Sequence, residues 1–455
     1  MFSHDWLEVG NMQKHLMSIG KAAVLNIAVL LSPLLTEAEQ VLCGSDRQNA
    51  EVRAAIFNVR DFGAKGDGIA KDTAAVQKAI DAAHAAGGGE VLLPAGIYLS
   101  GSIFLKSRVD FHLAQGAVLK GSPDPADYNA ADVVPQNAAS PRKGDNTSGA
   151  HLVLCVGQTD VMMRGPGKID GNVSAFLRDK DGKHPSSKRQ IVWRTSQMIW
   201  FVDSQRIRIS DLEIADAPYW SCFILNCSHV AVSGCYIHTC RNPHTYNGDG
   251  LDIDRCRYVT VSDCRIDTAD DCITLRASCG KRLSEPQDCA YITVANCVLS
   301  SSCNAIRLGV GEGNIHHAVF SNLVISDTKT AFNYVAAYSP TSRGTDITDI
   351  RVSNVLIDAL EFCRIHHMHS DVARFDNLYF SDISGKVRKP SRLYAVSKAP
   401  FGRIRFRNID LTEGFEAVNA PDVKAEDGTF RELPLSDAER AKLAAGVDAH
   451  TIRLH

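Results

Sequence analysis

The chain lacks several features that would point to particular protein classes. It has no excess charge of one sign, because 49 lysines and arginines stand against 52 aspartates and glutamates, for a formal net charge of -3. Without a basic excess there is no electrostatic footprint for DNA or RNA, so no nucleic-acid partner is predicted. The chain also lacks a membrane-spanning run. Residues 22–35 are apolar apart from three positions, but this stretch is shorter than the roughly 20 residues that cross a bilayer.

That short apolar stretch follows Lys14, His15 and Lys21. A basic segment before a short apolar one is typical of a secretory signal rather than of a membrane anchor. We therefore expect residues 1–45 to form a signal or leader segment. The protein is predicted to be secreted or periplasmic, with no attachment to a membrane.

From about residue 205 a short motif returns at steps of 23 to 33 residues. Each copy alternates apolar and polar residues over four to six positions, which is the period of a strand with one buried face. Turn-forming asparagine, aspartate and glycine follow, and helical spacing is nearly absent. The equivalent positions are Ser210, Ser233, Ser262, Ala295, Ser321, Ser353, Ser381 and Arg407.

A unit of this size cannot bury its own apolar face, so neighbouring units must stack. The repeat thus predicts an all-β solenoid of parallel sheets over residues 56–411, with turn asparagines and aspartates forming side-chain ladders. Cys235, Cys264 and Cys297 share one repeat position, which favours stacked core residues over disulfides. Residues 72–83 predict a helix that caps the first coil, and residues 412–455 are expected to form a helical tail.

Three aspartates have a spacing that indicates chemistry. Asp249 is followed 21 residues later by the adjacent pair Asp270 and Asp271, which is about one coil of the repeat. Equivalent positions in successive coils lie roughly 4.8 Å apart, so the three carboxylates are predicted to share one surface patch. Glycoside hydrolysis needs such a group, with one carboxylic acid to protonate the leaving oxygen and a carboxylate to activate water. Turn capping alone would not account for the adjacent pair.

The segments around these aspartates resemble a known enzyme family. Asn247-Gly248-Asp249-Gly250 and Ala269-Asp270-Asp271-Cys272 are similar to the Asn-Thr-Asp-Gly and Gly-Asp-Asp-Cys signatures of glycoside hydrolase family 28, the polygalacturonases. Likeness extends over roughly residues 56–410 and includes segments 58–68, 101–107 and 165–171. The resemblance implies a right-handed parallel β-helix and an inverting hydrolysis of a pectin-like polysaccharide without metal. It also implies that Asp270 is the general acid and that Asp249 and Asp271 hold the water.

Two positions depart from the family pattern. The Gly-His-Gly of the family falls at Cys303-Asn304-Ala305, so a neutral amide replaces a titrating histidine. Its Arg-Ile-Lys, which holds a galacturonate carboxylate, falls near Asn333-Tyr334-Val335, where neither cation is present. Rhamnogalacturonan or the end of a pectin side chain is therefore an alternative to homogalacturonan as the substrate.

Further residues complete the predicted site. Asn247, Asn304 and Tyr246 are assigned to substrate binding, together with Arg276 and Arg307, which strand alternation could turn outward toward an acidic sugar. The histidines at 316–317 and 366–369 lack the spacing of a metal site, and no metal or other cofactor is predicted. A polysaccharide lyase and a carbohydrate-binding solenoid without activity stay open as alternatives. The sequence predicts no oligomeric state.

Overall fold

The structure is a computed structural model that describes residues 55–129, 148–178, 190–191, 194–239, 247–278, 288–337, 342–368, 370–395 and 399–441. The predicted leader at residues 1–45 lies outside these ranges. Within them, no helix is both long and apolar enough to cross a membrane.

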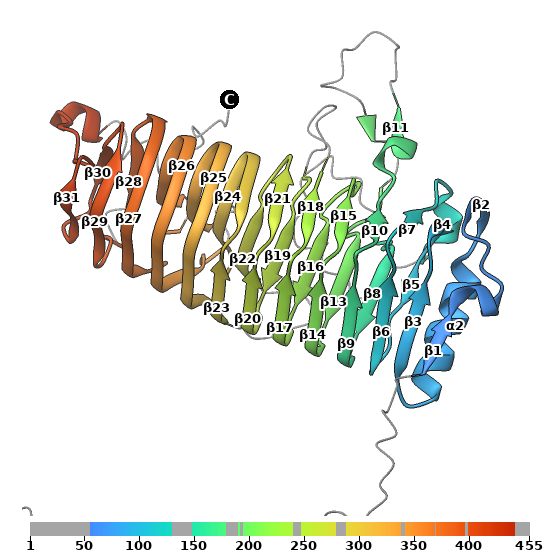
Figure 1. The fold of residues 1–455 in the computed structure, drawn as a ribbon. Helices are drawn as coiled ribbons and strands as arrows, with labels where there is room; N and C mark the ends of the chain where they lie inside the picture. The colour runs from blue at the N-terminus through green and yellow to red at the C-terminus, as the bar shows by residue number, and fades with distance from the viewer. Residues whose placement is uncertain are drawn as a thin grey trace, which may run out of the picture. The chain divides into compact units, whose positions relative to one another are not determined.

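Short parallel strands form three stacks that wind around one core (Figure 1). The front stack contains β5 (Ile103–Phe104), β8 (Val153–Val156), β13 (Ile199–Val202), β16 (Cys222–Leu225), β19 (Leu251–Asp254), β22 (Ile273–Ala277), β28 (Ser391–Tyr394) and β30 (Phe415–Val418). The back stack contains β1 (Ile56–Asn58), β3 (Gly89–Leu93), β6 (Val109–Leu113), β9 (Thr159–Arg164), β14 (Gln205–Ser210), β17 (Ser228–Ser233), β20 (Arg257–Ser262) and β23 (Cys289–Ala295). The side stack contains β2 (Asp67–Lys71), β4 (Gly96–Ser100), β7 (Ala117–Gly121), β10 (Lys168–Asp170), β15 (Glu213–Ala215), β18 (Tyr236–His238) and β21 (Arg265–Thr268).

From Val298 onward, longer strands run through more than one stack. These strands are β24 (Val298–Gly311), β25 (Asn314–Ala337), β26 (Asp346–Met368), β27 (Phe375–Lys389) and β29 (Ile404–Leu411). The short strand β31 (Val423–Gly428) follows them in the back stack. Outside the stacks, the structure has 3-10 turns at Val59–Phe62, Pro125–Asp127 and Val173–Phe176, and one antiparallel pair, β11 (Leu177–Arg178) with β12 (Gln190–Ile191). The predicted parallel β-helix is therefore confirmed.

Strand alternation fills the core as the repeat predicts. In the back stack Ile207, Val230, Val259 and Ile292 pair in register on four consecutive coils, and all four are buried. The stacked cysteines of the prediction are likewise buried, and each keeps a free thiol. One apolar side chain of each strand thus packs on its equivalent one coil away, which buries apolar surface along the whole stack.

Asparagine and aspartate side chains link the coils at the turn between the back and side stacks. Asn296 donates to Asp263 at 3.2 Å, Asn322 to Asn296 at 3.1 Å and Asn354 to Asn322 at 2.8 Å. The backbone of these four residues is left-handed, with φ between 54° and 57°. Asparagine and aspartate tolerate that conformation better than most residues do, which explains why the repeat places them there. The predicted ladder is confirmed.

Helix α2 (Thr73–Ala85) covers the first coil at the N-terminal end of the stacks (Figure 1). Its N-cap residue Asp72 makes no capping bond. Its carboxylate instead accepts hydrogen bonds from the backbone N–H groups of Lys65 and Gly66, at 2.7 and 3.0 Å. The predicted capping helix is confirmed, and its core face is the expected one: Val76, Ala79, Ile80 and Ala83.

The C-terminal end differs from the prediction. The coils continue past residue 411 through β30 and β31, and the described part of the tail is helical only at residues 437–441. Phe430 closes the core, with its ring 4.9 Å from the ring of Phe415. Strand β31 is the last of the back stack and is almost wholly exposed, so it needs no apolar alternation. The helical prediction for residues 415–428 was wrong because it relied on that alternation.

We expect Phe380→Ala to destabilise the C-terminal coils by roughly 3–5 kcal/mol, since it would open a cavity among packed aromatic rings. Phe380 is 1% exposed, and its ring centre lies 5.0 Å from that of Phe406 and 5.7 Å from that of Phe362. Urea denaturation followed by circular dichroism measures the effect. Leu356→Ala is the control, because Leu356 is 55% exposed. Equal transition midpoints for the two variants would contradict this account of the core.

Candidate active site

The predicted aspartates lie at the turn that leads from the side stack into the front stack. The N–H of Gly250 donates to the carbonyl of Asp271 at 2.8 Å, and the N–H of Cys272 donates to the carbonyl of Asn304 at 2.9 Å. Asp249, Asp271 and Asn304 therefore occupy equivalent positions on three consecutive coils. The structure brings them together as the 21-residue spacing predicts.

Gly250 explains part of the motif that holds Asp249. A Cβ atom at residue 250 would lie 2.6 Å from the carbonyl oxygen of Cys272 and 2.8 Å from the side chain of Ile266. Only glycine allows so close an approach of neighbouring coils directly after the aspartate. The glycine thus sets the position of Asp249 above the next coil.

Asp270 is the most accessible of the three aspartates. Its side chain is half-buried, whereas Asp249 and Asp271 are buried. Its backbone is held from two sides, because the hydroxyls of Thr268 and Ser301 donate to its carbonyl oxygen at 2.6 and 2.5 Å. Thr268 and Ser301 were not predicted from the sequence to belong to the site. Their signal is a threonine or serine at the same place in successive coils.

Asp271 is tied to two residues of the next coil. Its Oδ1 accepts a hydrogen bond from the Asn304 amide at 2.5 Å, and its Oδ2 pairs with the Arg307 guanidinium at 2.7 Å. The amide that replaces the family histidine thus binds a carboxylate of the cluster directly. A buried carboxylate needs such partners, because an uncompensated charge in this position would cost several kcal/mol.

Burial and like charge act together on Asp249. Removal from solvent raises the pKa of Asp249 well above its ordinary value, and the neighbouring carboxylates of Asp270, Asp252 and Asp271 raise that pKa further. Its Oδ1 has no hydrogen-bond partner in the described part of the chain. The cluster therefore retains a proton at a pH where isolated carboxyl groups are ionised.

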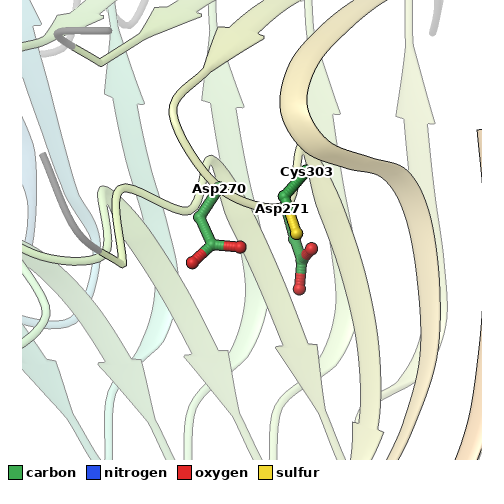
Figure 2. Close-up of side chains that lie close together, drawn as sticks. All are labelled: Asp270, Asp271 and Cys303. Carbon is green, nitrogen blue, oxygen red and sulfur yellow. The ribbon is translucent and has the colours of Figure 1, made fainter. Parts of the chain in front are cut away.

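Cys303 joins the cluster, although its thiol was not predicted to belong to the site. Side-chain atoms of Asp270, Asp271 and Cys303 lie within 4.8 Å of one another (Figure 2). Burial and the charges of Asp271 and Asp270 raise the pKa of the Cys303 thiol. The thiolate form, which binds metals and attacks substrates, is therefore disfavoured at this position.

Arg276 lies on the outer face of the front stack, beside the aspartates. Its guanidinium is 4.6 Å from the ring of Trp220, and its Nη1 is 3.5 Å from the Asp252 carboxylate. This arginine is already engaged with an aromatic ring and an acid. Asn247 lies in the turn before Asp249 with a left-handed φ of 58°, and Tyr246 lies outside the described residues.

A family model described as rhamnogalacturonase A/epimerase, pectate lyase-like, matches residues 56–333. The chain belongs to this family. The matched region includes all three aspartates as well as Asn304 and Arg307.

Individual relatives agree with this assignment. A probable polygalacturonase of Vitis vinifera is 26% identical over 283 residues, 59% of this chain and 55% of that protein. An exo-poly-α-D-galacturonosidase of Dickeya chrysanthemi is 29% identical over 265 residues, 50% of this chain and 42% of that protein. The chain thus spans about half the length of the curated relatives it matches. These relatives confirm the resemblance to the polygalacturonases.

A solved structure shows the same fold. The hyperthermoactive exopolygalacturonase of Thermotoga maritima superposes with a TM-score of 0.68 at 18% identity, over 83% of this chain and 91% of that one. The predicted right-handed parallel β-helix is confirmed by this likeness. At this identity the superposition bears on the fold alone.

We expect Asp252→Asn to reduce the pH dependence of stability. Burial raises the pKa of Asp252 to about 7, against the opposing charge of Arg276. The folded protein thus binds this proton more tightly than the unfolded chain does. The contribution of this bound proton to the free energy of unfolding is complete below about pH 4, the pKa of Asp252 in the unfolded chain. It is lost as the pH rises through the pKa of Asp252 in the folded protein.

Unfolding by urea at about pH 5 and about pH 8 tests this expectation. The wild type is expected to lose more stability than Asp252→Asn between the two values. Asp263→Asn is the control, because it makes the same change at an aspartate that lies in an exposed turn. Equal losses in the wild type and in Asp252→Asn would show that Asp252 does not hold the proton.

Proposed function

We propose that the protein hydrolyses glycosidic bonds of a pectic polysaccharide by an inverting reaction. Asp270 acts as the general acid, and Asp249 and Asp271 position and activate the attacking water. The observation that carries the proposal is the gathering of three carboxylates at one turn of the front stack, with one of them accessible. Membership of a family described by pectin-degrading activities supports it.

The raised pKa of Asp249 supports the acid–base chemistry. Strongly interacting carboxyl groups titrate as a group, so the retained proton belongs to the cluster rather than to a single residue. In the productive state this proton resides on Asp270, the member that solvent and substrate reach. Protonation of the leaving oxygen from this position is what general acid catalysis requires.

The water-activating side of the reaction falls to Asp249 and Asp271. Both oxygens of Asp271 are occupied by Asn304 and Arg307, which fixes its orientation and its charge. Among the residues that the structure describes, Oδ1 of Asp249 has no hydrogen-bond partner, and it is the acceptor left for a water molecule. Arg307 and Asn304 are thus positioning residues in this proposal, because they act through Asp271.

The names of the relatives favour a polymer of galacturonate, whereas the family description also names rhamnogalacturonase A. The front stack bears Asn333 and Val335 where the polygalacturonase pattern has cations, so homogalacturonan would have to be recognised by other residues. Homogalacturonan and rhamnogalacturonan are therefore both tested. A lyase would differ from either hydrolase, since it releases an unsaturated, ultraviolet-absorbing sugar.

Asp270→Asn is expected to lower the hydrolysis rate by roughly 10²–10⁴-fold, because the leaving oxygen would lose its proton donor. Release of reducing ends from homogalacturonan, rhamnogalacturonan and side-chain-rich pectin is measured in the presence of a chelator. NMR of the first product reports whether the anomeric configuration inverts.

Asp263→Asn is the matched control, because it makes the same change at an exposed aspartate on the same coil as Asp270, in the turn between the back and side stacks. It should leave the rate unchanged. Ultraviolet-absorbing products that vanish on chelation would replace the proposal by a lyase. No products from any polymer, together with retained binding, would replace it by a binding role.

A further inference from the structure

On the C-terminal side of the aspartates, the outer face of the front stack carries a row of polar side chains that are buried or half-buried. Arg307, Asn333, Arg364 and Arg392 pair in register on four consecutive coils. His366 lies two residues beyond Arg364 on the same strand and hence on the same face. Of these residues, only Arg307 has a part in the proposed reaction.

Three of these side chains have polar atoms without a partner among the described residues, although the side chains are almost fully buried. The atoms are Oδ1 of Asn333, Nε of Arg364 and Nδ1 of His366, in residues that are 5%, 6% and 3% exposed. Buried polar groups in folded proteins are nearly always hydrogen-bonded. These three atoms lie on one face of two neighbouring coils and lack the partners that a bound ligand could supply.

The charges around this site favour an anion. Glu361 is buried and accepts from Arg364 at 2.6 Å and from Arg392 at 2.7 and 2.8 Å, so its negative charge is already shared between two guanidinium groups. Burial, together with the positive charges of Arg364, Arg392 and Arg307, holds the pKa of His366 well below its usual range. His366 is therefore neutral, in a positive potential.

We propose that Asn333, Arg364 and His366 form a subsite for one uronic acid unit of the substrate polymer. The Arg364 guanidinium and the Nδ1–H of His366 donate to the carboxylate, and Oδ1 of Asn333 accepts from a sugar hydroxyl. The combination of two donors with one acceptor matches an anionic sugar better than a free anion, which has no hydroxyl to donate. The subsite begins one coil beyond Arg307 and so lies beside the proposed cleavage point.

This inference rests on the proposed function for the identity of the polymer. It assigns specificity for the carboxylate to Arg364 and His366 on β26, one coil beyond the positions that hold the cations in the polygalacturonase pattern. A guanidinium held in place by a buried glutamate is preorganised for a planar carboxylate, which raises selectivity for acidic over neutral sugars.

The test is a binding measurement in the Asp270→Asn background, which keeps the sugar chain intact. Titration calorimetry compares an oligogalacturonate with its carboxyl-reduced, neutral counterpart of equal length. Arg364→Gln is expected to weaken binding of the acidic oligosaccharide at least tenfold and to leave the neutral one unchanged. Arg351→Gln is the matched control, since Arg351 lies on the same strand but in the back stack, over the ring of Tyr379.

Asn333→Asp provides a second variant, in case Arg364→Gln fails to fold around the buried Glu361. It preserves shape and places a negative charge between Arg307 and Arg364, so it should fold while repelling the sugar carboxylate. Affinities for the oligogalacturonate within about twofold of the parent in both folded variants would overturn the subsite. Discrimination between the two oligosaccharides without hydrolysis by the wild type would retain the subsite and reject the hydrolase.

Discussion

The in-register stacking of equivalent positions is the constraint on which the rest of this structure depends. Each strand pairs with its equivalents one coil before and one coil after it, so a residue type at one position meets the same position again at the strand spacing of about 4.8 Å. Apolar side chains, cysteines and asparagines make stabilising contacts when the same residue type occupies the equivalent position of the next coil. The fold therefore tolerates wide variation in the length of its coils but little variation in the character of their core positions.

For charged residues the same stacking is unfavourable, because it brings like charges close together. Asp249 and Asp271 occupy equivalent positions, and their repulsion would be costly without compensation. Arg307 and Asn304 neutralise and fix Asp271, while Asp249 keeps a raised pKa. The repulsion between carboxylates is thus confined to one turn. The raised pKa that results there is what a hydrolase of the proposed kind needs for acid–base chemistry.

Stacking also determines how charged side chains are distributed over the outer face of the front stack. Acidic residues dominate the coils that carry the aspartate cluster, and arginines dominate the coils that follow, with Asn333 between Arg307 and Arg364. An acidic sugar chain that lay along this face would meet proton-donating groups at one point and cationic groups beside it. The arrangement links cleavage and recognition through coils that are neighbours in space and some thirty residues apart in the chain.

The sequence by itself determined the parallel β-helix, the capping helix, the cysteine stack and the meeting of the three aspartates, because period and spacing alone place residues on a regular solenoid. It failed for residues 415–428, where the last coil is exposed and loses the alternation that reveals a strand. Only the tertiary structure decided the pairing of Arg307 with Asp271, the place of Cys303 and the unpartnered atoms of Asn333, Arg364 and His366. Long side chains reach across coils, and burial depends on every neighbour, so neither can be read from spacing along one chain.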